Sequence, residues 1–197
     1  MSRVRYYAAC SLDGYIAEAD DTLDWLLKYE GSFEGASSTF EGADSAEGKA
    51  GYDAFYKEIG ALVSGSVTYE FVLEHEAEWP YAGKPTWVLS SRDLPKPEGE
   101  DVDVRIVNAK VPELIDEMLE AAGDRDLWVI GGGNVASQFA DHGLLDTVEV
   151  TVVPVVLGSG KPLFDRRLPG GPMQLTRART YASGMVGIDF EINRSAR

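Results

Sequence analysis

Short apolar runs and helical patterns alternate along most of this chain. Strands are predicted where apolar residues form short or alternating runs, at residues 4–10, 61–63, 86–89, 102–107 and 127–130. Helices are predicted where apolar residues recur at helical spacing, at residues 22–29, 52–59, 67–75, 111–122 and after 133. Ser66 is expected to be the N-cap of the third helix. Strands that alternate with helices indicate an α/β fold with a mostly parallel sheet.

The last third of the chain has a different pattern. Residues 146–156 are rich in Val and Thr and predict a long strand, with Pro154 near its end or at a bulge. Residues 174–181 and 186–193 alternate around Ser183-Gly184, which predicts a closing antiparallel hairpin. We therefore expect a single domain over residues 1–197, with a mostly parallel central sheet and antiparallel edge strands.

The stretch 31–50 interrupts this pattern. It consists mainly of Gly, Ser, Ala and acidic residues, with Phe33 and Phe40 as its large apolar side chains. A loop of this length in a compact domain is usually a functional lid or a mobile segment. A solvated insertion or a dimer arm is an equal alternative, and we expect a flexible insertion.

Charge excludes several classes of partner. The chain has 18 basic and 33 acidic residues and a net charge of -15, which argues against nucleic acids and anionic membranes because these bind clustered Lys and Arg. With one cysteine, Cys10, and two histidines, neither an internal disulfide nor a metal site is expected. No apolar run approaches the length of a membrane span, and we expect a cytoplasmic protein.

Three consecutive glycines are the most informative local feature. Gly131, Gly132 and Gly133 separate a predicted strand from a helix that carries Val135 and Phe139 four residues apart. A helix that begins directly after such a turn offers unpaired N–H groups to a phosphate. A tight strand-to-helix turn explains the glycines equally well. They do not form the G-x-G-x-x-G pattern of a Rossmann unit.

Four small or glycine-rich turns are expected at one rim of the sheet. They lie where predicted parallel strands end, at residues 9–10, 64–65, 90–91 and 131–133. Ligands of open α/β sheets bind beyond the carboxyl ends of the strands. The four turns therefore favour an extended phosphorylated small molecule as the ligand.

These turns resemble those of a known family. Residues 9–17 (ACSLDGYIA), 63–70 (VSGSVTYE) and 129–133 (VIGGG) are similar to segments of the dihydrofolate reductase superfamily. Residues 143–164 (GLLDTVEVTVVPVVLGSGKPLF) more closely resemble the reductase domain of bifunctional riboflavin-biosynthesis proteins and their stand-alone relatives. The resemblance implies a three-layer dihydrofolate reductase-like fold, with helices on both faces of the sheet and a C-terminal antiparallel hairpin. It also implies a homodimer.

The resemblance further implies a reductase that uses NADPH, with NADH as the alternative. The residues that it assigns to the cofactor are Ala9 and Ile16 at the nicotinamide, Gly65, Ser66 and Thr68 facing the phosphates, Leu89, Ser90, Ser91 and Arg92 at the adenosine end, and Ile130, Gly131, Gly132, Gly133, Asn134 and Val135 at the pyrophosphate. Ser66 stands where dihydrofolate reductases commonly have a basic residue. Arg92 is then the remaining partner for a 2′-phosphate.

The implied substrate is a small polar heterocycle. The nearest named activity is that of 5-amino-6-(5-phosphoribosylamino)uracil reductase of riboflavin biosynthesis. However, Tyr7 and Thr147 stand where that branch commonly has a lysine and an acidic residue. Thr151 is expected at the substrate floor, and Lys161 either meets an anionic substrate group or is solvated. Reduction of a pterin, and nucleotide binding without catalysis, are the alternatives.

Hydride transfer also requires a proton from a carboxylate, a tyrosine or an ordered water. The candidate donors are Asp53, Tyr52 and Tyr15, and Asp53 ranks first because it follows the insertion on an aromatic-rich helix. A solvated aspartate near a helix start is the simpler interpretation of Asp53. Asp24 and Glu30 are, beside Asp53, the other candidates for the one buried carboxylate that the resemblance implies for a pterin substrate. Residues 148–153 are a candidate edge strand for pairing with a second subunit.

Overall fold

The computed structural model describes residues 2–30, 46–181 and 183–193. The strands in these ranges are β1 (Val4–Ser11), β2 (Tyr15–Ala17), β3 (Ile59–Gly65), β4 (Thr86–Leu89), β5 (Val104–Val107), β6 (Asp126–Gly131), β7 (Thr147–Val153), β8 (Lys161–Pro162), β9 (Gln174–Thr180) and β10 (Val186–Glu191). The helices are α1 (Asp24–Glu30), α2 (Ala46–Glu58), α3 (Ser66–His75), α4 (Val111–Ala122) and α5 (Gly133–Asp141).

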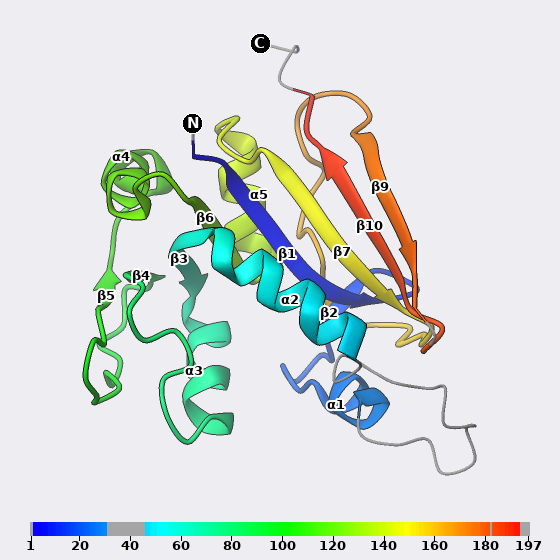
Figure 1. Cartoon of the computed structure of the whole chain (residues 1–197), viewed down its shortest axis with the longest axis horizontal. Helices are drawn as coiled ribbons and strands as arrows, with labels where there is room; N and C mark the ends of the chain where they lie inside the picture. The colour runs from blue at the N-terminus through cyan, green and yellow to red at the C-terminus, as the bar shows by residue number, and fades with distance from the viewer. Residues whose placement is uncertain (1, 31–45, 182, 194–197) are drawn as a thin grey trace.

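Eight of these strands form one sheet, in the order β5-β4-β3-β6-β1-β7-β10-β9. The pairs from β5 to β7 are all parallel, whereas β10 runs antiparallel to both β7 and β9 (Figure 1). The predicted sheet with its C-terminal hairpin is therefore confirmed. Because six neighbouring strands are parallel, their carboxyl ends all lie at one edge of the sheet.

Helices cover both faces of the sheet, as expected. On one face, Met118 of α4 and Phe139 of α5 are fully buried in a cluster with Val63 of β3 and Val129 of β6. The preceding residues of the same strands, Leu62 and Trp128, point to the other face and pack against Phe55 of α2. This alternation follows from the two-residue period of a strand. In Figure 1, α2 crosses in front of the sheet and α5 lies behind it.

Two expected boundaries change. Helix α2 already begins at Ala46, inside the stretch 31–50 that was expected to be an insertion, because Ala46, Glu47, Lys49 and Ala50 are good helix formers. Residues 31–45 of that stretch lie outside the described ranges. Ser66 is the first residue of α3 rather than its N-cap, a position that Gly65 takes in an extended conformation.

The expected edge strand at 148–153 is an interior strand. β7 lies between β1 and β10, with Ala9 and Gly187 on either side of Thr151. The prediction was wrong because the terminal hairpin adds β10 and β9 beyond β7, so that β9 forms the edge. In the described part of the chain, no helix has the length and apolar character needed to cross a membrane.

Candidate functional site

A cavity of about 620 Å³ lies at the carboxyl ends of the parallel strands. Strand ends contribute Ala9, Gly65, Leu89 and Gly131 to its lining, and α3 and α5 both begin beside it. Of the predicted cofactor residues, Ser90, Ser91 and Arg92 are not among the lining residues of this cavity. The other twelve do line it: Ala9, Ile16, Gly65, Ser66, Thr68, Leu89, Ile130, Gly131, Gly132, Gly133, Asn134 and Val135. The structure thus brings three of the four expected turns to one cavity, and the fourth, at residues 90–91, follows directly after the lining residue Leu89.

The three glycines have different structural roles. A Cβ on Gly133 would lie 2.4 Å from the carbonyl oxygen of Pro162, and Gly131 has a φ of 153°, a conformation that favours glycine. A Cβ on Gly132 would meet no atom closer than 3.7 Å, where Ile16 Cδ1 lies. Backbone conformation therefore favours glycine at position 131 and packing requires it at position 133, whereas Gly132 keeps the surface of the cavity free of a side chain. The peptide bond between Gly131 and Gly132 is cis.

A short antiparallel pair forms one wall of the cavity. In β2 and β8, Tyr15 pairs with Pro162 and Ala17 pairs with Lys161. This pairing places Ile16 and Lys161 at the same cavity. The turn before β2 is fixed by Asp13, whose carboxylate accepts hydrogen bonds from the Ser11 hydroxyl and the N–H of Gly158, both at 2.7 Å. The Asp13-Gly14 signal in the sequence therefore marks the turn that aligns this wall.

The charged side chains of the cavity are already paired. Among the described lining residues, Lys161 is the one basic side chain, and its Nζ lies 3.2 Å from the Asp21 carboxylate. The Asp165 carboxylate accepts hydrogen bonds from Asn134 at 2.6 Å and Arg166 at 2.8 Å. Burial alone would raise the pKa of Asp165, but these hydrogen bonds and the Arg166 charge lower it to about 2. Asp165 is therefore ionised at neutral pH and holds no proton to donate.

Tyr6 is the tyrosine among the described lining residues of the cavity. Its phenol donates a hydrogen bond to the carbonyl oxygen of Leu163 at 3.2 Å, and its ring packs edge-on against Phe164 at 5.4 Å. Burial raises the pKa of Tyr6, so the phenol stays neutral. Tyr6 and Asp165 were both missed in the sequence. Tyr6 follows the apolar pattern of a core strand, and Asp165 reaches the cavity from a loop without a recognisable motif.

The three candidate proton donors are absent from the described lining of the cavity. Asp53 is exposed on α2, and Tyr15 belongs to the β2 wall. The Tyr52 ring stacks on Tyr56 at 5.8 Å and packs edge-on against Trp128 at 6.1 Å, and burial raises its pKa. Their catalytic roles stay predictions.

Of the two predicted substrate residues, one lines the cavity and the other does not. Lys161 lines the cavity, whereas Thr151 lies in β7, next to Ala9 of β1, and is not among its described lining residues. Asp24 is exposed at the start of α1, and the Glu30 side chain lies outside the described set. Thr151 therefore borders the site through its strand neighbour.

Arg92 lies just beyond the described lining and pairs with an acidic residue. Its Nη1 donates to Glu70 Oε1 at 3.0 Å, and its Nη2 donates to Glu70 Oε2 at 2.5 Å. The Ser90 hydroxyl accepts a hydrogen bond from the Arg92 backbone N–H at 3.0 Å and fixes the turn after β4. The expected 2′-phosphate partner is therefore engaged by Glu70.

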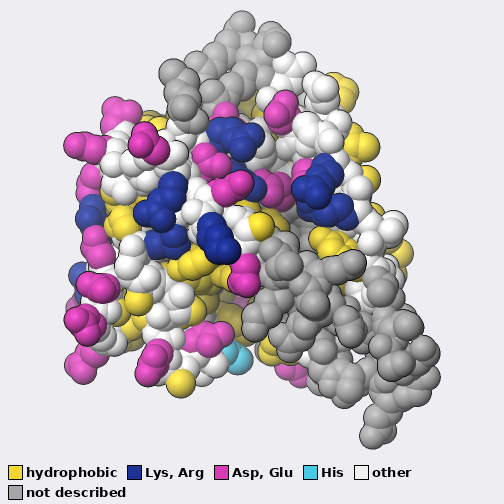
Figure 2. Space-filling view, in the orientation of Figure 1, with side chains coloured by type: hydrophobic (Ala, Val, Ile, Leu, Met, Phe, Trp, Pro, Cys, Tyr) yellow, Lys and Arg dark blue, Asp and Glu magenta, His cyan; other side chains and the backbone are white. Residues whose placement is uncertain are grey.

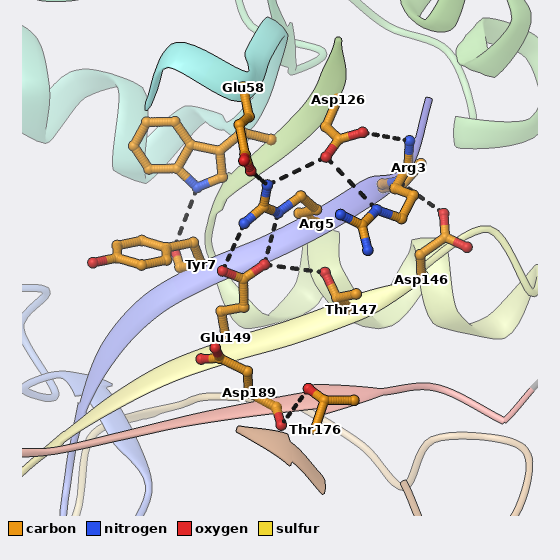
Figure 3. Close-up of polar contacts among 12 residues, drawn as sticks. Arg3, Arg5, Tyr7, Glu58, Asp126, Asp146, Thr147, Glu149, Thr176 and Asp189 are labelled. Atoms are coloured by element: carbon orange, nitrogen blue, oxygen red, sulfur yellow. Dashed lines mark hydrogen bonds and ion pairs between the residues drawn. The ribbon is translucent and has the colours of Figure 1, made fainter. Parts of the chain in front are cut away.

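A second charged group lies at the opposite end of the strands. Arg5 is held by Glu149, Asp126 and Glu58, which reach it from β7, β6 and α2 (Figure 3). On the face shown in Figure 2, Lys and Arg side chains lie among Asp and Glu side chains. The carboxylates of Glu149, Asp126 and Glu58 neutralise the Arg5 guanidinium near the amino ends of the strands. We therefore interpret Arg5 and these three carboxylates, the Arg5 group, as structural.

Comparison with known proteins identifies the family. The model of the RibD C-terminal domain matches residues 67–187, more than half of the chain. This chain belongs to the RibD C-terminal domain family. It is also 32% identical over 159 residues to the uncharacterised protein YwjB of Bacillus subtilis, with 80% of each chain covered. A second uncharacterised protein of that organism, YyaP, is 24% identical over 192 residues, covering 94% of this chain and 92% of YyaP.

Solved structures show the same fold. A candidate riboflavin biosynthesis protein from Shewanella sp. PV-4 superposes with a TM-score of 0.76 at 27% identity, covering 98% of this chain and 99% of that one. A deaminase/5-amino-6-(5-phosphoribosylamino)uracil reductase from Thermotoga maritima gives a TM-score of 0.58 at 14% identity, covering 98% of this chain and 57% of that one. The expected dihydrofolate reductase-like fold of RibD reductase domains is confirmed.

Proposed function

We propose that this protein is a reductase that uses NADPH or NADH to transfer a hydride to a small polar heterocycle. The observation that carries the proposal is the cavity at the strand ends, where the glycine turn and the first turns of α3 and α5 meet. Membership of the RibD C-terminal domain family supports it. The reaction of riboflavin biosynthesis is the nearest named chemistry and serves as the first substrate class to test.

The residues of the cavity fit a dinucleotide. Gly132 leaves space where a Cβ would stand, so a pyrophosphate can approach the backbone at the start of α5. Ala9 and Ile16 offer a small apolar surface that suits a nicotinamide ring, and Leu89 lies toward the adenosine end. When bound, the cofactor supplies the hydride. The protein residues position the two reactants and exclude water.

The described cavity residues favour water as the proton source. Asp165 is ionised at neutral pH, and the Tyr6 proton is committed to the Leu163 carbonyl. We propose that an ordered water delivers the proton, with Asp53, Tyr52 and Tyr15 as the alternatives. If Asp53 is a direct general acid, Asp53→Asn should lower kcat by about 100-fold or more. With water as the donor, the loss of kcat in Asp53→Asn should stay below about tenfold. Tyr52→Phe tests the second alternative donor, on the same helix, by the same criterion.

Titration with NADPH and NADH, followed by nicotinamide fluorescence, tests the proposal. We expect at least one of them to bind with a dissociation constant in the micromolar range, and Gly132→Val, which fills the cavity surface, to abolish that binding. Hydride loss is then followed at 340 nm against a panel of pyrimidines and pterins. Binding with no turnover across the panel would favour a nucleotide-binding protein, and binding of neither nucleotide would contradict the proposed function.

A further inference from the structure

Glu70 occupies the two guanidinium nitrogens of Arg92 that a cofactor phosphate would use at the expected adenosine end. Both terminal nitrogens of the Arg92 guanidinium donate to the two carboxylate oxygens of Glu70, at 3.0 and 2.5 Å. A phosphate would use the same two N–H groups, because its oxygens match the guanidinium fork as a carboxylate does. Glu70 and a 2′-phosphate therefore compete for Arg92.

The pair lies next to the proposed dinucleotide site. Ser66 lines the cavity at the first residue of α3, and Glu70 follows four residues later on the same face of the helix. On the strand side, Leu89 lines the cavity at the end of β4, and Arg92 follows three residues later. The ion pair thus joins the two elements that border the adenosine end.

The surroundings make this end of the cavity unfavourable for added negative charge. Glu70 also borders a neighbouring hollow of about 360 Å³, whose other acidic lining residues are Asp20, Asp21, Asp24 and Glu74. Lys161, the one basic residue among the described cavity lining, is paired with Asp21. Among the described residues that border this end of the cavity, Arg92 is therefore the arginine or lysine that is placed to recognise a 2′-phosphate.

We propose that Glu70 is a specificity-determining residue that suppresses the preference for NADPH over NADH. NADPH must displace Glu70 from Arg92 or place its 2′-phosphate beside the Glu70 carboxylate, and both are unfavourable. NADH carries uncharged ribose hydroxyls at this position, and a carboxylate oxygen accepts hydrogen bonds from hydroxyls. This inference rests on the proposed function and adds the residue that sets its cofactor.

The test compares dissociation constants for NADPH and NADH in the wild type and in Glu70→Gln. The amide leaves Arg92 free of its charged partner, so NADPH affinity should rise about tenfold relative to NADH, equivalent to a single charge-assisted contact reduced by solvent. Glu74→Gln is the matched control, since it removes the same charge from the same helix and hollow without touching Arg92. Its NADPH/NADH ratio should change by less than about twofold.

A second substitution shows that Arg92 carries the gain. Arg92→Ala should change NADPH affinity little in the wild type, where Glu70 holds the guanidinium, and should remove the gain in Glu70→Gln. An unchanged or lowered NADPH preference in Glu70→Gln overturns the inference while leaving the reductase proposal intact, provided that NADH binds. Binding of neither nucleotide to the wild type overturns both.

Discussion

The guanidinium of Arg5 in β1 donates two hydrogen bonds to the carboxylate of Glu149 in β7, at 2.7 and 2.8 Å. Both residues are buried, and they connect neighbouring parallel strands in the middle of the sheet. Asp126 and Glu58 contact the remaining terminal nitrogen, and the Arg5 guanidinium lies 4.6 Å from the centre of the Phe55 ring. The group therefore connects β1, β6, β7 and α2 through one side chain.

We predict that Glu149→Gln lowers the free energy of unfolding by about 2 kcal/mol, because the buried Arg5 guanidinium loses the carboxylate that accepts two of its hydrogen bonds and keeps only Asp126 and Glu58 as charged partners. Urea denaturation monitored by tryptophan fluorescence measures the change. Glu117→Gln is the control, since its bond to Arg105 at 2.8 Å lies on the surface and should contribute less than about 1 kcal/mol. Equal losses in the two variants would show that the buried pair has no special role.

Alanine substitutions in the glycine turn should separate folding from binding. Gly133→Ala places a Cβ 2.4 Å from the Pro162 carbonyl oxygen, so it should lower stability by about 2 kcal/mol through overpacking. Gly132→Ala meets no close atom, so we expect a stability change within about 0.5 kcal/mol. Its methyl group projects where the dinucleotide approaches, and NAD(P)H affinity should fall at least tenfold. Thermal melting and fluorescence titration check both outcomes, and an unaffected affinity in Gly132→Ala would argue against the binding site.

Cys10 should react slowly in the folded protein. Burial, with a further contribution from Asp13, raises the pKa of its thiol to about 11. Because the folded state favours the neutral thiol, this contribution to stability is present at neutral pH and is lost as pH rises from the unfolded pKa toward 11. At pH 8, reaction with Ellman's reagent should be about 100-fold slower than in urea. Comparable rates in the two conditions would mean that the thiol is accessible.

Asp165 should make stability depend on acid pH. Its pKa of about 2 lies below the unfolded value, so the stabilisation is complete above about pH 4 and is lost as pH falls toward 2. Asp165→Asn cannot ionise and lacks this dependence. The difference in urea midpoint between the wild type and Asp165→Asn should therefore shrink between pH 5 and pH 2. A constant difference over this range would show that the Asp165 carboxylate does not stabilise the loop against α5.

Sequence reasoning identified the parts of the site that are made of backbone. The turns at Gly65, Leu89 and Gly131 were placed correctly because a strand followed by small residues has a local pattern, and parallel strands bring such turns to one edge. The strand 86–89 and the helix 111–122 match β4 and α4 residue for residue. In these elements, local propensity and burial agree.

Side-chain partners could not be read in the same way. The sequence offered Arg92 as a phosphate partner, but only the approach of α3 to the end of β4 showed that Glu70 holds it. Tyr6 and Asp165 enter the cavity from a core strand and an irregular loop, where no local pattern marks them. In the Arg5 group, Arg5 and Glu149 are 144 positions apart in the sequence.

The sequence by itself determined the fold class, the strand-end rim and the glycine turn, because these follow from periodicity and from the conformational freedom of glycine. The tertiary structure decided that β7 is an interior strand, which carboxylates are already paired, and which candidate residues lie away from the cavity. The physical reason is that strand order, ion pairs and cavity walls arise from contacts between distant segments. Hydrophobic patterning specifies that such contacts form, but it does not specify which polar side chains meet.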